Sequence, residues 1–143
     1  MKKHGVIFIG FLILLTGCQP DKRNSVSTFQ LELHMSKDYD DSDPFVDERL
    51  FYVDEDMEQV QLDFQIKMKG SSGSLEIANN DTGEVFWQED WNTQLDAKKE
   101  CVLNLKKNIE YVIRFTGTGI QYADITMSSK RQLKERNKPL RNQ

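Results

Sequence analysis

Residues 60–68, Val-Gln-Leu-Asp-Phe-Gln-Ile-Lys-Met, decide the fold class of this chain. Every second residue of this stretch, from Val60 to Met68, is apolar, and the residues between them are polar. Because successive side chains of a β-strand point to opposite faces, the pattern predicts a strand with one buried and one wet face. Burial on one face is typical of antiparallel sheets, so we expect an antiparallel β protein.

Three further stretches alternate in the same way, at residues 29–35, 101–105 and 111–115. Polar clusters rich in glycine, serine, asparagine and lysine separate the expected strands and indicate turns. These clusters lie at residues 70–73, 79–83, 106–108 and 116–119. We expect the second cluster to close a hairpin between residues 75–78 and 84–88.

The spacing of strands and turns predicts a small antiparallel β-sandwich of about seven to eight strands, with a small barrel as the alternative. Residues 46–53 fit either a short helix or a strand, and the neighbouring strands favour a strand. In the last expected strand, Ile120 and Tyr122 share one face whereas Ala123 and Ile125 share the other. We therefore expect a β-bulge near Tyr122.

The N-terminus has the features of a secretory signal peptide. Lys2 and Lys3 precede an apolar run at residues 6–15, Val-Ile-Phe-Ile-Gly-Phe-Leu-Ile-Leu-Leu. Ten residues span about 15 Å as a helix, half of the hydrocarbon core of a bilayer, which is too short for a permanent transmembrane helix. The run is followed by small residues, as expected before a signal cleavage site.

Those small residues, Leu15-Thr16-Gly17-Cys18, resemble the lipobox of bacterial lipoproteins. The resemblance implies that the signal is cleaved before Cys18 and that the Cys18 thiol carries a diacylglyceryl anchor. Two acyl chains are enough for stable membrane attachment. The alternative is an ordinary secretory signal with a chance cysteine. Gln19 differs from the aspartate that retains lipoproteins in the inner membrane of two-membrane cells, so we expect an extracytoplasmic position on the cell membrane or outer membrane.

The chain then divides into four segments: a signal peptide at 1–17, a polar, flexible lipid-anchored tether at 18–27, a β-sandwich domain at 28–129 and a basic C-terminal tail at 130–143. Residues 73–77, 81–83 and 111–115 give the sandwich a resemblance to small jelly-roll modules of bacterial secreted proteins and to the GOLD-type sandwich. That resemblance implies a domain that mediates contacts without catalysis. It assigns no site residues.

Charge is unevenly distributed. The whole chain has a net charge of -4, which argues against a nucleic-acid partner. Residues 38–58 hold ten acidic side chains and one arginine. Part of this segment could gather oxygen ligands for Ca²⁺ in an irregular loop, although it lacks the EF-hand spacing; the alternative is a solvated acidic loop. The candidate calcium ligands are Asp38, Asp40, Asp41 and Asp43.

The tail at residues 130–143 holds six basic side chains and one acidic one, with few apolar residues. We expect a frayed helix or a disordered segment there. Such a tail can remain in solvent, lie on anionic headgroups or wall polymers, or fold back on the acidic segment.

Two tryptophans are the candidate ligand contacts. Trp91 lies in an expected connecting segment, so we expect it to be exposed, whereas Trp87 follows the alternation of Val85 and is the weaker candidate. His34 is expected to face solvent without a partner, and Cys101 to be a small buried apolar residue. The sequence contains no recognisable catalytic motif, so we expect neither an enzyme nor a cofactor.

The sequence therefore predicts a lipid-anchored lipoprotein whose β-sandwich binds an envelope protein or glycan without catalysis. The alternative is a structural accessory subunit of an envelope transport or secretion complex. An unrecognised hydrolase is a third reading.

Overall fold

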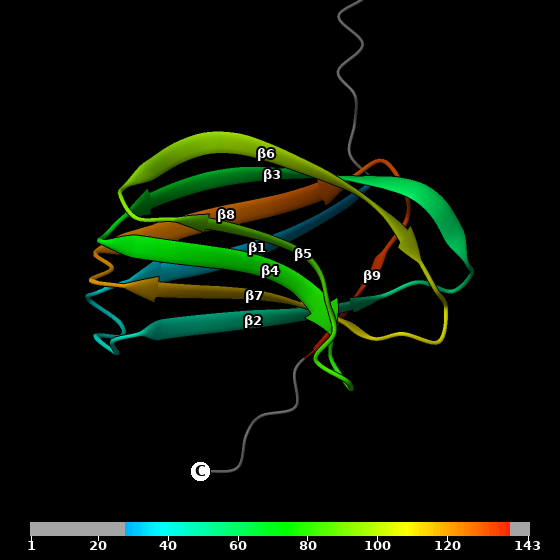
Figure 1. Cartoon of the computed structure of the whole chain (residues 1–143), viewed down its shortest axis with the longest axis horizontal. Helices are drawn as coiled ribbons and strands as arrows, with labels where there is room; N and C mark the ends of the chain where they lie inside the picture. The colour runs from blue at the N-terminus through cyan, green and yellow to red at the C-terminus, as the bar shows by residue number, and fades with distance from the viewer. Residues whose placement is uncertain (1–27, 138–143) are drawn as a thin grey trace, which may run out of the picture.

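The computed structural model describes residues 28–137, and within them it contains nine β-strands and no helix (Figure 1). The strands are β1 (Phe29–Ser36), β2 (Phe45–Tyr52), β3 (Met57–Lys69), β4 (Ser72–Asn79), β5 (Val85–Trp91), β6 (Leu95–Leu105), β7 (Tyr111–Thr118), β8 (Tyr122–Ser129) and β9 (Lys134–Arg136).

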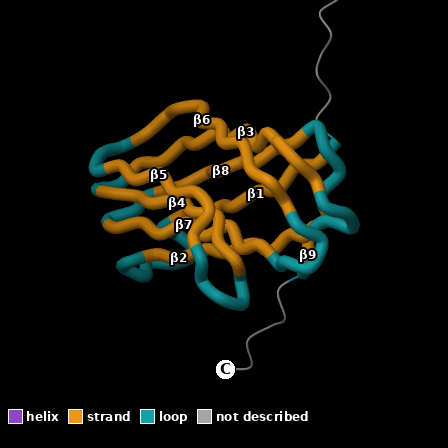
Figure 2. Tube along the Cα trace, turned by 45° about the vertical axis from the view of Figure 1, so that its right-hand side comes forward, coloured by secondary structure: helices purple, strands orange, loops and turns teal. Residues whose placement is uncertain are grey.

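The strands form two antiparallel sheets that pack face to face (Figures 1 and 2). The four strands of sheet A follow the order β1-β8-β3-β6, and the five strands of sheet B follow β5-β4-β7-β2-β9. The first eight strands thus pair as β1 with β8, β2 with β7, β3 with β6 and β4 with β5, which is the winding of a jelly roll. The predicted antiparallel sandwich is confirmed, and the barrel alternative is wrong.

Residues 60–68, with their strict alternation, form the middle of β3, which pairs with β8 on one side and β6 on the other. Its apolar side chains point between the sheets, where Leu62 and Ile66 are completely buried. Sheet B supplies the opposite wall of the core with Ile77, Ile113 and Phe115. The polar residues of the same strands lie on the outer faces, as alternation requires.

The last long strand needs no bulge at Tyr122. Strand β8 begins at Tyr122, and Ile120 lies in the turn before it, where it packs into the core with 7% of its surface exposed. Gly117 makes this turn compact, because a Cβ there would lie 2.5 Å from Cδ1 of Ile120. The irregularities of pairing occur instead between Met57 and Val60 and at the end of β4.

Residues 46–53 belong to strand β2 and to the residue after it, so the preference for a strand over a helix is confirmed. The predicted hairpin at residues 79–83 is also confirmed. The backbone N–H of Gly83 donates to the carbonyl of Asn79 at 2.8 Å, and Gly83 adopts φ 75°, which favours glycine. Strand β6 begins at Leu95, earlier than the alternation at residues 101–105 indicated.

The prediction of a frayed or disordered tail is wrong for residues 130–137. Leu133 is buried in the core with 4% of its surface exposed, and β9 then pairs with the end of β2. Lys134 forms an ion pair with Asp54 of the acidic segment at 2.5 Å, so the tail does fold back on that segment. An apolar anchor, backbone pairing with the edge of β2 and two ion pairs, Lys134 with Asp54 and Arg136 with Glu110, hold this segment in place. Residues 138–143 lie outside the described part.

Inward-pointing charges occupy the two open sides of the sandwich. On the β5/β6 side, Lys99 donates to Glu89 at 2.6 Å, and this pair joins the two sheets. On the β1/β2 side, Asp47 and Arg49 of β2 lie 3.9 Å apart, on the same face of the strand as buried Phe45 and Phe51. Charges that point inward along an exposed edge oppose the addition of another strand, because pairing would bury them.

Candidate functional site

A hollow of about 620 Å³ lies on the outer face of sheet A. Its volume is within the range of sites for small ligands. We call it the sheet A hollow and define it by six outward-pointing side chains: Asp63, Gln65, Lys98, Glu100, Thr126 and Ser128.

The pairing register brings these residues together from three strands that are far apart in the sequence. In one cross-strand row Thr126 of β8 lies opposite Gln65 of β3, which lies opposite Lys98 of β6. In the next row Ser128, Asp63 and Glu100 are neighbours in the same order. Adjacent strands are about 4.8 Å apart, so each row spans about 10 Å. In these two rows β8 contributes only the short side chains of Thr126 and Ser128, beside the longer side chains of β3 and β6, so the face is hollowed there.

Most of the polar groups in the hollow have no partner within the described residues. The Gln61 amide donates to Asp63 at 2.7 Å and approaches Glu100 at 3.4 Å, so both carboxylates are held from one side. The side chains of four lining residues make no hydrogen bond or ion pair with another described residue; these are Gln65, Lys98, Thr126 and Ser128. The hollow therefore offers several unpaired donors and acceptors to a ligand.

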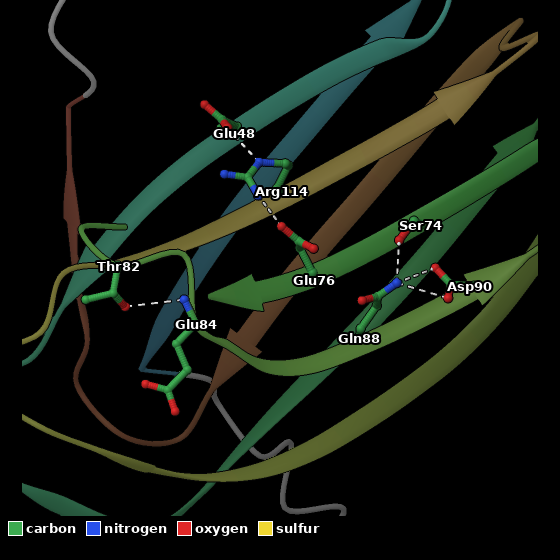
Figure 3. A network of polar contacts seen from close by, with 8 residues as sticks. All are labelled: Glu48, Ser74, Glu76, Thr82, Glu84, Gln88, Asp90 and Arg114. Carbon is green, nitrogen blue, oxygen red and sulfur yellow. Dashed lines mark hydrogen bonds and ion pairs between the residues drawn. The ribbon is translucent and has the colours of Figure 1, made fainter. Parts of the chain in front are cut away.

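The outer face of sheet B carries a polar cluster whose groups are already paired (Figure 3). Arg114 of β7 lies opposite Glu48 of β2 on one side and Glu76 of β4 on the other. Its Nε donates to Glu48 at 2.7 Å, and its Nη1 donates to Glu76. The hydrogen bond to Glu48 is the main reason why the pKa of Arg114 is raised, with both carboxylates adding to the effect. This cluster stabilises three adjacent strands and leaves its guanidinium engaged.

Gln88 lies on the same outer face of sheet B, on the neighbouring strand β5. Its amide donates to both carboxylate oxygens of Asp90, at 2.9 and 3.0 Å, and lies 3.5 Å from the Ser74 hydroxyl (Figure 3). Hydrogen bonds from Ser74 and then Gln88 lower the pKa of Asp90. A second hollow, of about 630 Å³, lies beside β9. Within it Glu110 already accepts hydrogen bonds from Asn80 and Arg136.

Trp91 is not exposed, so the prediction that made it the first ligand candidate is wrong. Only 8% of its surface is accessible, and its indole N–H points at the sulfur of Met68, 3.1 Å away. Trp91 is the last residue of β5 and lies opposite Gly73 of β4. Because Gly73 has no side chain, the indole packs across it into the core and stacks near Phe115 with ring centroids 6.2 Å apart.

Trp87 is the more accessible of the two tryptophans. It is half-buried and stacks on Phe64 across the two sheets, with ring centroids 4.9 Å apart and planes 5° from parallel. Its predicted place on the core face is correct. Neither indole is presented as a platform, since each has one face against another aromatic ring.

The acidic candidates lie in the loop between β1 and β2. Asp40 accepts hydrogen bonds from Ser42, which lower the pKa of its carboxyl group, and Asp43 accepts one from the backbone N–H of Gly119. Asp38 and Asp41 are exposed in the same loop. Within residues 28–137 no three acidic, histidine or cysteine side chains are grouped so that they could hold a metal ion. The loop does not assemble the calcium site that its spacing suggested.

Cys101 is buried as predicted, and burial raises the pKa of its thiol to about 12. His34 faces solvent as predicted, but it is not alone, because it contacts Asp124 on the neighbouring strand β8. Cys18, the predicted site of lipid attachment, lies outside the described residues.

Neither the sheet A hollow nor the Arg114 cluster was predicted from the sequence. The polar residues of both are visible as the outward positions of alternating strands. Which strands lie side by side is not visible, because β3, β6 and β8 are separated by long stretches of chain. A jelly-roll pairing order applied to the predicted strands would have been the signal.

Among residues 28–137 there is no helix of the length and hydropathy needed to cross a membrane. No curated protein matches the chain. A family described as a domain of unknown function, DUF4624, matches residues 19–140. The match covers the whole sandwich and most of the chain, and the protein therefore belongs to the DUF4624 family.

Proposed function

We propose that this protein is a lipid-anchored lipoprotein on the extracytoplasmic side of a bacterial membrane, and that its sandwich is a non-catalytic binding module for an envelope protein or glycan. The observation that carries the anchoring is Leu15-Thr16-Gly17-Cys18 directly after the apolar run at residues 6–15. The family match begins at residue 19, immediately after the cysteine, which agrees with a mature chain that starts at Cys18.

The start of the sandwich lies at one end of the domain, where a short segment could join it to a lipid on Cys18. The described residues begin at Thr28, whose backbone N–H donates to the carbonyl of Ser129 at one end of the sandwich. The residues from Cys18 to Thr28 can extend over about 35 Å at most. A lipid at Cys18 would therefore hold the sandwich close to the membrane by the end that carries the β6–β7 loop and β9 (Figure 1).

The chemistry of the described residues favours binding over catalysis. Hydrogen bonds lower the pKa of three carboxyl groups, those of Asp40, Asp56 and Asp90, so these groups stay ionised near neutral pH. A general acid needs the opposite displacement. The Arg114 cluster is a set of satisfied cross-strand pairs rather than a poised reactive group.

The accessory-subunit alternative would be favoured by a large apolar surface, which excludes water when a permanent partner covers it. The exposed large apolar residues of the described part are separated over the molecule: Tyr39, Val46, Val85, Val102 and Tyr122. They occupy a loop and the outer faces of two different sheets. This surface therefore favours a reversible, polar contact with a ligand over a permanent apolar interface with a partner subunit.

Metabolic labelling tests the anchor. Bacteria that express the full chain are grown with a palmitate analogue carrying an alkyne, and the purified protein is coupled to a fluorophore. We expect label in the wild type, no label in Cys18→Ala, and full label in Cys101→Ala, the matched cysteine control. Mass spectrometry should find Cys18 at the mature N-terminus, and Cys18→Ala should accumulate as a precursor that keeps residues 1–17. Label that persists in Cys18→Ala, or a wild type without label, would refute the anchor.

A further inference from the structure

We propose that the sheet A hollow binds an uncharged, hydroxyl-rich saccharide. The inference rests on the proposed function and names the ligand class of the binding module. Three features of the hollow support it: its size, the convergence of polar side chains from β3, β6 and β8, and the lack of partners for four of these side chains.

The groups in the hollow complement the edge of a sugar ring. Each sugar hydroxyl can donate one hydrogen bond and accept others, as the Thr126 and Ser128 hydroxyls and the Gln65 amide also can. Asp63 and Glu100 accept from hydroxyls, and their shared contact with Gln61 fixes them in place without using all of their acceptor sites. Lys98 supplies a strong donor on β6, two residues before Glu100 on the same face. Aliphatic stems of the same side chains can contact the C–H faces of the ring.

Charge argues against an anionic ligand. Two carboxylates, Asp63 and Glu100, face one available ammonium group, that of Lys98. Lys99 also borders the hollow, but its ammonium is engaged with Glu89. The site therefore carries an excess of negative charge, which repels phosphate-rich or uronic-acid polymers.

The side chains of the hollow argue against a peptide. Peptides commonly add to a sheet edge through backbone hydrogen bonds or insert apolar anchors into a groove. The hollow lies on the outer face of sheet A, over β8, β3 and the edge strand β6, and its outward side chains include no aromatic or aliphatic residue that could hold such an anchor. Tyr122 is on the same face of β8, but four residues from Thr126, or about 13 Å along the strand. Without a stacking ring, we expect weak binding with fast exchange.

The test is an NMR titration of the lipidated, ¹⁵N-labelled full chain in detergent micelles. The probes are two uncharged oligosaccharides, tetra-N-acetylchitotetraose and cellotetraose. We expect at least one of them to shift amide signals at residues 63–65, 98–100 and 126–128, with a dissociation constant on the order of millimolar. Polygalacturonate serves as the anionic comparison and should bind at least tenfold more weakly.

Matched variants locate the site. Thr126→Gln fills the hollow from a half-buried position in the middle of β8, and we expect it to weaken binding at least tenfold. Thr116→Gln makes the same change at a half-buried position in the middle of β7, on the outer face of sheet B, and should leave binding unchanged. Lys98→Met keeps the aliphatic stem at an exposed position and should weaken binding several-fold without affecting the fold.

Several results would overturn the proposal. One is the absence of shifts at these residues with both oligosaccharides; another is unchanged affinity in Thr126→Gln and Lys98→Met proteins whose spectra show a native fold. Tighter binding of polygalacturonate, or binding of a pentapeptide probe in place of the sugars, would overturn the ligand class. The anchor is tested separately: label on Cys18 together with failure of the sugars refutes the saccharide site and leaves the lipoprotein proposal standing.

Discussion

The contact between Gly73 and Trp91 allows the placement of Trp91 in the core to be tested by a double-mutant cycle. A Cβ atom on Gly73 would lie 2.5 Å from Cε2 and Cζ2 of the Trp91 indole and 2.7 Å from its Nε1. Real Cβ atoms do not approach other atoms this closely, so Gly73→Ala must displace the ring or the strand. Overpacking of this kind costs about 1–3 kcal/mol.

Trp91→Ala removes a side chain that is 8% exposed and leaves a cavity beside Met68 and Phe115. Deletion of a large buried aromatic residue costs about 3–5 kcal/mol. For a domain slightly larger than 100 residues each kcal/mol lowers Tm by about 4 °C, so we expect Trp91→Ala to melt at least about 12 °C below the wild type.

In the double variant the indole that would obstruct the new methyl group is absent. In the Trp91→Ala background we therefore expect Gly73→Ala to be stabilising. The gain should be a few tenths of a kcal/mol, up to about 1, because alanine loses less conformational entropy in a strand than glycine. The coupling energy between the two sites should be about 2 kcal/mol in the stabilising direction.

The assay is urea unfolding followed by far-UV circular dichroism, since substitution of Trp91 changes the fluorescence itself. Ser74→Ala is the control: it lies on the same strand but points outward, and its cost should be the same in both backgrounds. If Gly73→Ala costs as much with Trp91→Ala as without it, the indole does not lie over Gly73. A Trp91→Ala cost below about 1 kcal/mol would return Trp91 to the surface, where the sequence analysis had placed it.

Two further predictions concern the thiol and the tail. Burial raises the pKa of the Cys101 thiol from its ordinary value of 9.0 to about 12. Above pH 9 the unfolded chain therefore loses this proton while the folded chain keeps it. The free energy of unfolding of the wild type should then fall by about 1.4 kcal/mol per pH unit until the folded thiol also ionises. Cys101→Ala should lack that part of the slope in urea unfolding at rising pH, and parallel curves for the two proteins would show that the thiol is not buried. Leu133→Ala should lower the free energy of unfolding by about 2–4 kcal/mol, because Leu133 is 4% exposed and its loss leaves a cavity. Lys134→Met breaks the exposed ion pair with Asp54 and should lower it by less than about 1 kcal/mol, with no effect in high salt. Equal costs for these two changes would contradict the view that an apolar anchor, rather than charge, orders β9.

Much of the fold was predictable because alternation is a local property. The residues that alternate in β1, β3 and β7 are the residues that point into the core, and the turn at residues 79–83 has the composition that its geometry needs. The segment that became β9 was not predictable in this way. It has one apolar residue, Leu133, and its order depends on the free edge of β2, which exists only after folding.

The tryptophans show the same limit at the level of single residues. Trp87 and Trp91 both occupy inward positions of β5, but the sequence presents Trp91 as part of a connection because an acidic pair precedes it and polar residues follow it. Whether its indole is covered depends on the neighbour across the strand pair. That neighbour is Gly73, which is eighteen residues away in the chain and has no side chain to exclude the ring.

The sequence by itself determined the fold class and the assignment of most side chains to the inside or outside. It could do so because the two-residue period of a strand is visible in consecutive residues. It also supplied the Leu15–Cys18 motif on which the proposed anchor rests. The tertiary structure decided which outward residues share a surface. Strand order and register bring Gln65, Lys98 and Thr126 into one row, since hydrogen-bonded strands lie about 4.8 Å apart whatever their separation along the chain. A binding surface on a sheet is therefore a product of strand pairing, which no local pattern encodes.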